Sequence, residues 1–168
     1  MLRFLRMPVV VVVAGLWCAA GLTAGCSSKE NRYPEDHARF MKIDRAVEEL
    51  RSAYTRRDLG DIQGMMLPRE ALEKATNDIQ QDFQTYQEIT LEWNVDRIVI
   101  ESESVEVVVN WAGQWRKTPA DVGTRERGQG ILKLAGEKTF LLNGLEGDLP
   151  FGMASRRAGE PQPATRPR

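Results

Sequence analysis

Residues 88–100 of this 168-residue chain are EITLEWNVDRIVI, and this stretch decides the fold. Apolar and polar side chains alternate from Ile89 to Val95, as in a strand with one buried face. In the second half of the stretch the apolar side chains change from odd to even positions. One extra residue near Asp96-Arg97 would produce this change, and such a β-bulge bends a strand. The stretch therefore predicts a bent strand in a curved sheet.

Three more segments after this strand have the composition of strands. They are joined by short turns, a longer loop at 118–124 and a tight hairpin turn at Gly136-Glu137. Gly128 and Gly130 interrupt the second of these segments and favour another bend there. The predicted strands are 105–115, 125–135 and 138–145.

Three helical segments precede the strands. In residues 35–58 apolar side chains recur at steps of three and four, which places them on one face of a helix. A short second helix is expected around residues 59–66, and Pro68 is expected to begin a third, because its missing N–H costs nothing there. The apolar faces of the two long helices consist of Phe40, Ile43, Val47, Leu50 and Tyr54, and of Leu72, Ala75, Ile79, Phe83 and Tyr86.

Helices followed by a curved antiparallel sheet of about four strands form an α+β arrangement. This order resembles the nuclear-transport-factor-2-like (NTF2-like) superfamily, also called SnoaL-like or cystatin-type. The residues that carry the resemblance are VEELRSAY at 47–54, Arg57-Asp58-Leu59, and the strands that follow. The resemblance implies a cone-shaped domain over residues 35–152, with the long helix in the concave face of the sheet. Members include enzymes, ligand binders and assembly domains, so the resemblance predicts a fold and not an activity.

The chain begins with the features of a secretory signal. Two arginines precede an apolar run at 8–17, and small residues follow it. The sequence LTAGC at 22–26 resembles a lipobox, the motif at which bacterial lipoproteins are lipidated and cleaved. The resemblance implies cleavage between Gly25 and Cys26 and attachment of lipid to the Cys26 sulfur. Thr23 departs from the family pattern, in which leucine is commoner at this position.

Two other interpretations of this segment remain open. Residues 7–28 carry no charge and are long enough to span a bilayer. Gly21 and Gly25 also form a pair typical of helix packing in membranes. The segment would then be a retained membrane anchor, or an ordinary secretory signal. The position of the cysteine, directly between small residues and the polar Ser27-Ser28, favours lipidation.

A lipidated Cys26 predicts how and where the protein is attached. Its sulfur would carry at least two acyl chains, which lasting attachment to a membrane requires. In the family an aspartate after the cysteine retains the protein in the inner membrane, so Ser27 predicts the periplasmic face of the outer membrane, with the inner membrane as the alternative. Residues 26–34 would form a tether. Residues 153–168, rich in arginine and proline, are predicted to be a disordered basic tail. The tail is either a solvated end or a segment whose arginines touch anionic lipid or cell-wall polymers.

The composition limits the classes of partner. Without residues 1–25 the chain has 21 basic and 24 acidic side chains, a formal charge of −3. This balance gives no reason to expect nucleic acid as a partner. The two cysteines are Cys18, inside the signal, and Cys26, so the domain is expected to depend on its core and not on a disulfide.

Few side chains suggest a reaction. His37, the single histidine, precedes the apolar face of the first helix and is expected to be exposed, so neither a metal site nor a Ser-His-Asp triad is predicted. No cofactor is predicted either, because Gly128-Gln129-Gly130 lies inside a strand and is not a phosphate-binding loop. The side chains left for an acid/base role are Tyr54, Asp58, which is expected to cap a helix, Tyr86, and Asp96 at the bulge.

The candidate binding residues are mostly aromatic. Trp111 and Trp115 are expected on one face of their strand and Trp93 on the neighbouring strand, where they pack against the helices or line a pocket or an interface. Tyr54 and Asp96 complete this candidate site. The leading hypothesis is a non-catalytic, lipid-anchored domain that binds a protein or cell-wall partner. The alternatives are a cone-pocket carrier or enzyme for a small apolar ligand, and a structural spacer.

Overall fold

The structure, a computed structural model, describes residues 34–158. The predicted signal, the lipidation site at Cys26 and residues 26–33 of the predicted tether lie outside the described residues, as does the predicted tail beyond residue 158.

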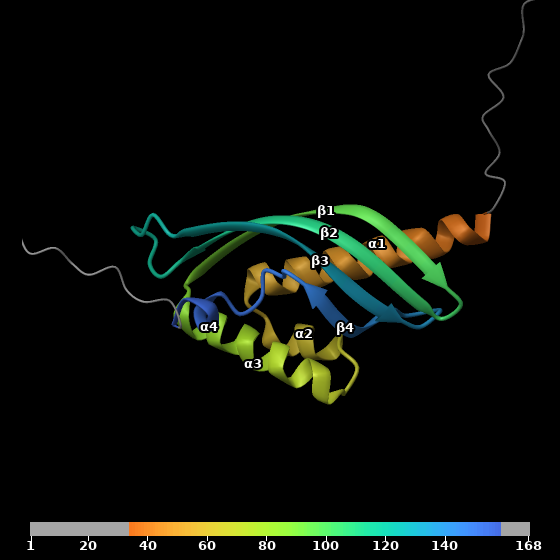
Figure 1. The fold of residues 1–168 in the computed structure, drawn as a ribbon, viewed down its shortest axis with the longest axis horizontal. Helices are drawn as coiled ribbons and strands as arrows, with labels where there is room; N and C mark the ends of the chain where they lie inside the picture. Colours follow the sequence, from red (N-terminus) through yellow and green to blue (C-terminus); the bar gives the residue numbers. More distant parts are fainter. Residues whose placement is uncertain (1–33, 159–168) are drawn as a thin grey trace, which may run out of the picture. The chain divides into compact units, whose positions relative to one another are not determined.

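The predicted α+β arrangement is confirmed: three helices lead into a four-stranded antiparallel sheet, and a short helix ends the described part (Figure 1). The strands pair in the order in which they occur in the chain. The elements are α1 (Pro34–Arg56), α2 (Leu59–Gly64), α3 (Glu70–Thr85), β1 (Glu88–Glu101), β2 (Ser104–Arg116), β3 (Thr124–Ala135), β4 (Leu141–Gly147) and α4 (Met153–Ala158).

Helix α1 lies against the inner face of the sheet along the whole length of β2. At the start of the helix the Arg39 guanidinium donates a hydrogen bond to the carbonyl of Ser102, in the turn that precedes β2. Near its end, Tyr54 meets Trp115, the penultimate residue of β2. The buried face of α1 consists of Ile43, Val47, Leu50, Ala53 and Tyr54.

The bulge predicted in the first strand is confirmed. Val95 is opposite Val109 in the neighbouring strand, and Arg97 is opposite Val108, so Asp96 is the extra residue. The bulge keeps Ile98 against the core after the change of phase. The change of the apolar side chains from odd to even positions therefore corresponds to one extra residue in the strand, which keeps the same face of the strand buried.

The prediction for the last strand was wrong at its beginning. Strand β4 starts at Leu141 and not at residue 138, and a five-residue loop, 136–140, replaces the predicted two-residue turn. Gly136 has a φ of +127°, and a Cβ there would lie 2.1 Å from the Thr139 carbonyl oxygen. The chain folds back on itself at this point, which buries Phe140 before the pairing with β3 begins.

The predicted start of the third helix at Pro68 was also wrong, since α3 begins at Glu70. Met66 forms a parallel bridge with Leu142 of β4, and the Leu67 N–H donates to the Leu142 carbonyl over 2.8 Å. The segment before α3 is therefore held extended against the edge of β4, and it pairs part of the edge that the sheet would otherwise expose.

The predicted domain end at residue 152, with disorder from Met153, is corrected by the structure. Residues 153–158 form α4, and Met153 is only 3% exposed. The N–H groups of Gly152 and Ala154 both donate to the carboxylate of Asp82 in α3, each over 2.7 Å. We call residues 148–158 the C-terminal strap.

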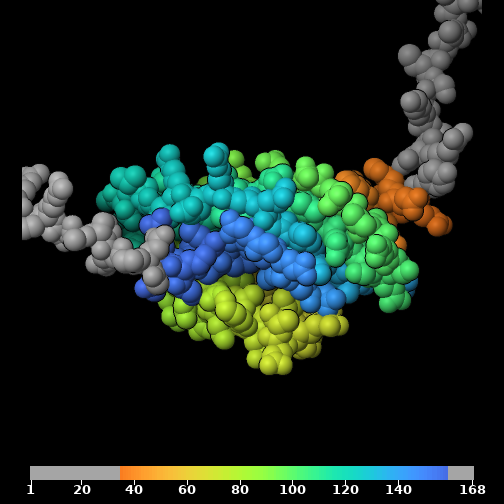
Figure 2. Space-filling view, in the orientation of Figure 1, coloured from red at the N-terminus to blue at the C-terminus, as the bar shows by residue number. Residues whose placement is uncertain are grey.

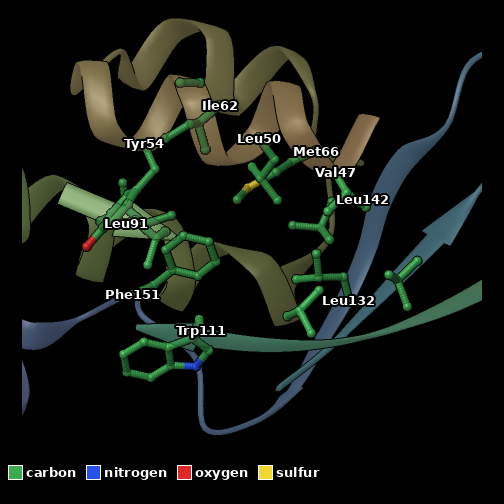
Figure 3. Packing of buried hydrophobic residues seen from close by; sticks show 14 of the residues in the cluster. Val47, Leu50, Tyr54, Ile62, Met66, Leu91, Trp111, Leu132, Leu142 and Phe151 are labelled. Atoms are coloured by element: carbon green, nitrogen blue, oxygen red, sulfur yellow. The ribbon is translucent and has the colours of Figure 1, made fainter. Parts of the chain in front are cut away.

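One continuous core lies between the inner face of the sheet and the helices (Figure 3). The strap belongs to this core, and two glycines of β3 make room for it. A Cβ on Gly128 would lie 2.3 Å from a carboxylate oxygen of Asp148, and a Cβ on Gly130 would lie 2.4 Å from the Leu149 side chain. The β2–β3 pairing passes through both glycines without a shift of register, so their function here is close packing of the strap.

Candidate functional site

The interior of the cone contains a chain of buried hydrogen bonds centred on Tyr54. The Trp115 indole N–H donates to the Tyr54 hydroxyl over 3.0 Å, and this hydroxyl donates to Oδ2 of Asp82 over 2.7 Å. All three side chains have 0% exposure. The three come from α1, α3 and β2, so the hydrogen bonds connect both helices to the sheet.

Burial affects the pKa values of Tyr54 and Asp82 in this chain of hydrogen bonds. Loss of solvent raises the pKa of the Tyr54 hydroxyl well above its ordinary value, and the negative charge of Asp82 acts in the same direction. Tyr54 therefore stays protonated and donates. Burial also raises the pKa of the Asp82 carboxyl above 3.8, against the lowering effect of the Ala154 N–H and the other donors around it.

The strap closes this group from the side opposite α1. The Phe151 ring packs edge-on against Tyr54, with 4.9 Å between ring centroids, and lies 6.2 Å from the ring of Trp93. The Trp111 indole N–H donates to the Asp148 carbonyl over 2.7 Å. Figure 3 shows Phe151, Tyr54 and Leu91 together in the interior. The space that would form a ligand pocket is filled by the chain itself.

Two surface cavities of the described residues lie away from Tyr54. One of about 500 Å³ lies beside the α2–α3 connection, lined by residues such as Met66 and Leu72. Another, of about 560 Å³, lies between α3 and the strap, lined by residues such as Asp78 and Arg156. Neither is lined by Tyr54 or by the residues bonded to it. In the space-filling view, the blue β4 and strap fill the region between β3 and the yellow-green α3 (Figure 2).

The structure brings together three of the five predicted site residues. Tyr54, Trp111 and Trp115 lie in the cone, with the two tryptophan rings 6.1 Å apart in a T-shaped pair. Trp93 is half-buried and packs against the same core, and its indole N–H is buried without a hydrogen-bond partner. Asp96 is exposed and takes no part in the bonds around Tyr54.

The other candidates behave as structural residues. Asp58 accepts the Asp61 N–H over 2.9 Å and caps α2, as predicted. Tyr86 is 3% exposed, and burial raises the pKa of its hydroxyl. His37 is exposed in the first turn of α1, as predicted.

Sequence reasoning missed Asp82, the acidic residue at the centre of the group. A signal existed: Asp82 lies three residues after Ile79 and four before Tyr86, so it occupies the apolar face of its helix. A carboxylate at such a position is buried only when donors surround it. Two of its donors come from the strap, about seventy residues later in the chain. No local sequence pattern predicts these two donors.

The outer face of the same sheet has the opposite character. Outward residues of β1, β2 and β3 lie in rows across the strands, among them Glu92–Ala112–Arg127 and Asn94–Asn110–Gln129. All six are exposed. Gln129 donates to Asn110 across the strands over 3.0 Å.

Two further properties concern only residues 34–158. No helix in this part is long and apolar enough to cross a membrane. This part also contains no group of three or more histidine, cysteine, aspartate or glutamate side chains arranged to hold a metal ion.

Comparison with known proteins identifies the fold. No family model matches the chain, and no curated protein matches it. Solved structures do. A conserved protein from Planctomyces limnophilus superposes with a TM-score of 0.55 at 15% identity, covering 67% of this chain and 99% of that one. A putative dehydratase of the NTF2-like family from Streptomyces avermitilis gives 0.53 at 9% identity, covering 67% and 99%.

The chain has the NTF2-like fold. A putative scytalone dehydratase from Novosphingobium aromaticivorans, with a TM-score of 0.55, 10% identity and coverage of 68% and 87%, has a similar structure. At these identities the similarity shows the fold alone, because this fold carries several unrelated activities.

Proposed function

We propose that this protein is a lipid-anchored lipoprotein of the bacterial cell envelope, whose NTF2-like domain binds a protein partner through its surface without catalysis. The observation that carries the non-catalytic part is the closed cone. Tyr54, Asp82 and Trp115 in its interior bond to one another, Asp82 also bonds to the strap, and the Phe151 ring packs against Tyr54.

The hydrogen-bond inventory supports a structural role for this interior. The Tyr54 hydroxyl has a donor, Trp115, and an acceptor, Asp82. The Asp82 carboxylate accepts from Tyr54, Gly152 and Ala154. A catalytic acid or base needs access to a substrate proton, and these two groups have 0% exposure.

The anchor is supported by the sequence at 22–26 and by the polar segment that follows Cys26. Fractionation of cells that express the tagged chain tests it. We expect the wild type in the membrane fraction, with an intact mass that starts at Cys26 and includes a diacylglyceryl group. We expect Cys26→Ser to lose both the lipid and the membrane attachment. A soluble wild type, or a mass that still contains residue 1, would contradict the proposal.

A second candidate, a carrier or enzyme for a small apolar ligand, is favoured by one observation. Tyr54 and Asp82 place a proton donor and a carboxylate 2.7 Å apart deep in the cone, and some structures of similar fold are named as putative dehydratases. This candidate requires the strap to open. We expect indole or benzene to bind Phe151→Ala, which removes the ring beside Tyr54, and not the wild type. Binding of such probes to the wild type would favour the second candidate.

A further inference from the structure

The two edges of the sheet differ in what lies beside them. The edge of β4 is paired in part, because Met66 bridges to Leu142 and the Leu67 N–H bonds to the Leu142 carbonyl. Strand β1, the outermost strand at the other side, pairs with β2 alone among residues 34–158 (Figure 1). An open strand edge presents unpaired N–H and C=O groups, which can bind another extended chain.

Two arginines of α1 bond to the ends of this edge and leave its middle open. The Arg51 guanidinium donates to the Leu91 carbonyl over 2.8 Å, near the start of β1. The Arg39 guanidinium donates to the carbonyl of Ser102, directly after the end of β1. Between Leu91 and Ser102 no side chain of residues 34–158 forms a hydrogen bond with the backbone of β1.

The bond to Leu91 shows which backbone groups point away from the sheet. Backbone groups of alternate residues point to the same side of a strand, so Trp93 and Val95 direct theirs away from β2, as Leu91 does. The same holds for Ile98 and Ile100 after the bulge, because they lie opposite odd-numbered residues of β2, as the three residues before the bulge do. Four residues therefore offer an N–H and a carbonyl to a further strand.

Apolar surface borders these open backbone groups. A cavity of about 200 Å³ lies between the edge and α1, and it is lined by Asp44, Val47, Glu48, Trp93, Asn94 and Val95. Further along the edge, Ile100 is 39% exposed. Phe40, one turn before Asp44 on the same side of α1, is 44% exposed. The edge thus combines unpaired backbone groups with uncovered apolar side chains.

The charge along this edge is negative. Strand β1 has one basic side chain, Arg97, and four acidic ones, Glu88, Glu92, Asp96 and Glu101. Asp44, in the cavity beside the edge, forms no ion pair within residues 34–158. Opposite charges on neighbouring strands attract, and like charges repel. The edge therefore favours a strand with basic side chains.

We propose that this edge binds an extended basic segment of a protein partner, which adds a fifth strand to the sheet beside β1. The backbone of the segment pairs with Trp93, Val95, Ile98 and Ile100, and its basic side chains reach Asp44 and the carboxylates of β1. Residues 93–100 lie opposite seven residues of β2, 105–111, so a segment of seven residues spans the open part. The inference rests on the proposed partner-binding function and names the chemistry of the partner.

Two other occupants fit this edge less well. Strand β1 of a second copy would bring a second strand with four acidic side chains and one basic one against the first. The basic tail of the chain has prolines at 161, 163 and 167, which leave no run of more than three residues with an N–H in residues 161–168. Proline cannot donate a hydrogen bond to a neighbouring strand.

Two synthetic peptides test whether the edge takes a strand. One is Lys-Val-Lys-Val-Lys-Val-Lys, and in its matched control prolines replace the valines, so both have the same charge but the control lacks every second N–H. With the full-length lipoprotein in zwitterionic micelles, we expect the first peptide at saturation to slow hydrogen exchange of the Trp93, Val95, Ile98 and Ile100 amides by about tenfold or more. The control is expected to leave these amides unchanged. Equal effects of the two peptides, or no effect of the first, would overturn the inference.

Charge reversal tests the basic character of the segment. At about 0.15 M salt, where charges interact over about 8 Å, we expect Asp44→Lys to bind the lysine–valine peptide about fivefold more weakly than wild type. Glu49→Lys makes the same change at an exposed position of α1 outside the cavity and is expected to change the affinity by less than about twofold. Equal losses in the two variants would contradict a contact at Asp44. Peptide binding only to a chain that ends at Ala158 would identify the tail as the occupant, and a wild-type dimer that the peptide dissociates would identify a second copy; either would overturn the inference.

Photo-cross-linking in isolated membranes separates this inference from the proposed function. A photoreactive side chain at Ile100 is expected to join the chain to a protein, and the lysine–valine peptide is expected to suppress that product. The comparison positions are Asn110, exposed on the outer face of the sheet, and Gln80, exposed on α3. Product from these two positions alone would overturn the edge as the binding site and leave the proposed function in place. No product from any of the three positions would contradict the proposed function as well.

Discussion

The two faces of strand β2 differ completely in what they contact. Its inward side chains are buried against the helices and the strap: Val105, Val107, Val109, Trp111 and Trp115. Its outward side chains between residues 106 and 114 lie outside the core cluster: Glu106, Val108, Asn110, Ala112 and Gln114. The concave inner face is the kind of surface on which ligand sites usually form. Here the chain fills that face itself, and the outer face of the sheet stays exposed.

The largest expected loss of stability comes from removing a buried side chain from the inner face of β2. Trp115→Ala removes a fully buried ring and its hydrogen bond to Tyr54. We expect it to lower the free energy of unfolding by about 3–5 kcal/mol, measured by urea denaturation. Asn110→Ala, on the outer face of the same strand, is the matched control and is expected to change it by less than about 0.5 kcal/mol. Similar losses in both variants would remove the distinction between the faces.

The strap is expected to behave as part of the inner face. A chain ending at Gly152 loses the buried Met153 and the Ala154 N–H that bonds to Asp82. We expect this truncation to lower the free energy of unfolding by about 2–4 kcal/mol. A chain ending at Ala158 is expected to unfold as the full chain does. If both truncations had the stability of the full chain, the strap would not be a structural element.

Two glycine-to-alanine substitutions compare the inner and outer faces of the sheet, because each adds one methyl group to one face. Gly128→Ala places a Cβ 2.9 Å from the Trp111 ring and closer still to Asp148. We expect a loss of about 1–3 kcal/mol and faster hydrogen exchange in the strap. Gly144→Ala adds its Cβ at 3.5 Å from Lys133, an ordinary contact, and serves as the control. Unchanged strap protection in Gly128→Ala would show that the packing against β3 is loose.

The smallest expected effect depends on pH. Burial raises the pKa of Asp82 in the folded chain above 3.8, so the folded state binds this proton more tightly than the unfolded state. The contribution of Asp82 to the free energy of unfolding therefore increases as pH falls through the raised pKa toward about 3.8, and is lost as pH rises. Asp82→Asn removes this contribution. Urea titrations at several pH values give the free energy of unfolding of wild type and variant. As the pH falls, we expect this free energy to change in favour of wild type relative to the variant. A change in favour of the variant would contradict the direction assigned to the Asp82 pKa.

The sequence predicted most of the fold because most of it depends on local periodicity. The change of phase near Asp96 predicted the bulge, and steps of three and four predicted α1 and α3. The start of β4 was missed because loop 136–140 depends on a positive φ at Gly136. Helix α4 was missed because its first turn is stabilised by Asp82, which no short segment around Met153 can reveal.

The candidate site was predicted only in part for a similar reason. Tyr54, Trp111 and Trp115 have the spacing of inward residues, so their convergence on the inner face followed from the pattern. Whether the cone is open or filled depends on Phe151, in a segment with glycine and proline and no period. Local sequence pattern predicts which side chains face the inside of the cone. Whether that space is open or filled depends on a contact between segments far apart in the sequence.

Hydrogen exchange of the Trp115 indole N–H and the Gly152 amide tests the closed cone most directly. Both groups donate to buried acceptors inside it. We expect both to exchange only through global unfolding, with the same opening free energy as the Val107 amide in the centre of β2. Exchange of the indole or of Gly152 through a local opening, orders of magnitude faster than Val107, would contradict the account, because it would show a cone that opens to solvent in the native protein.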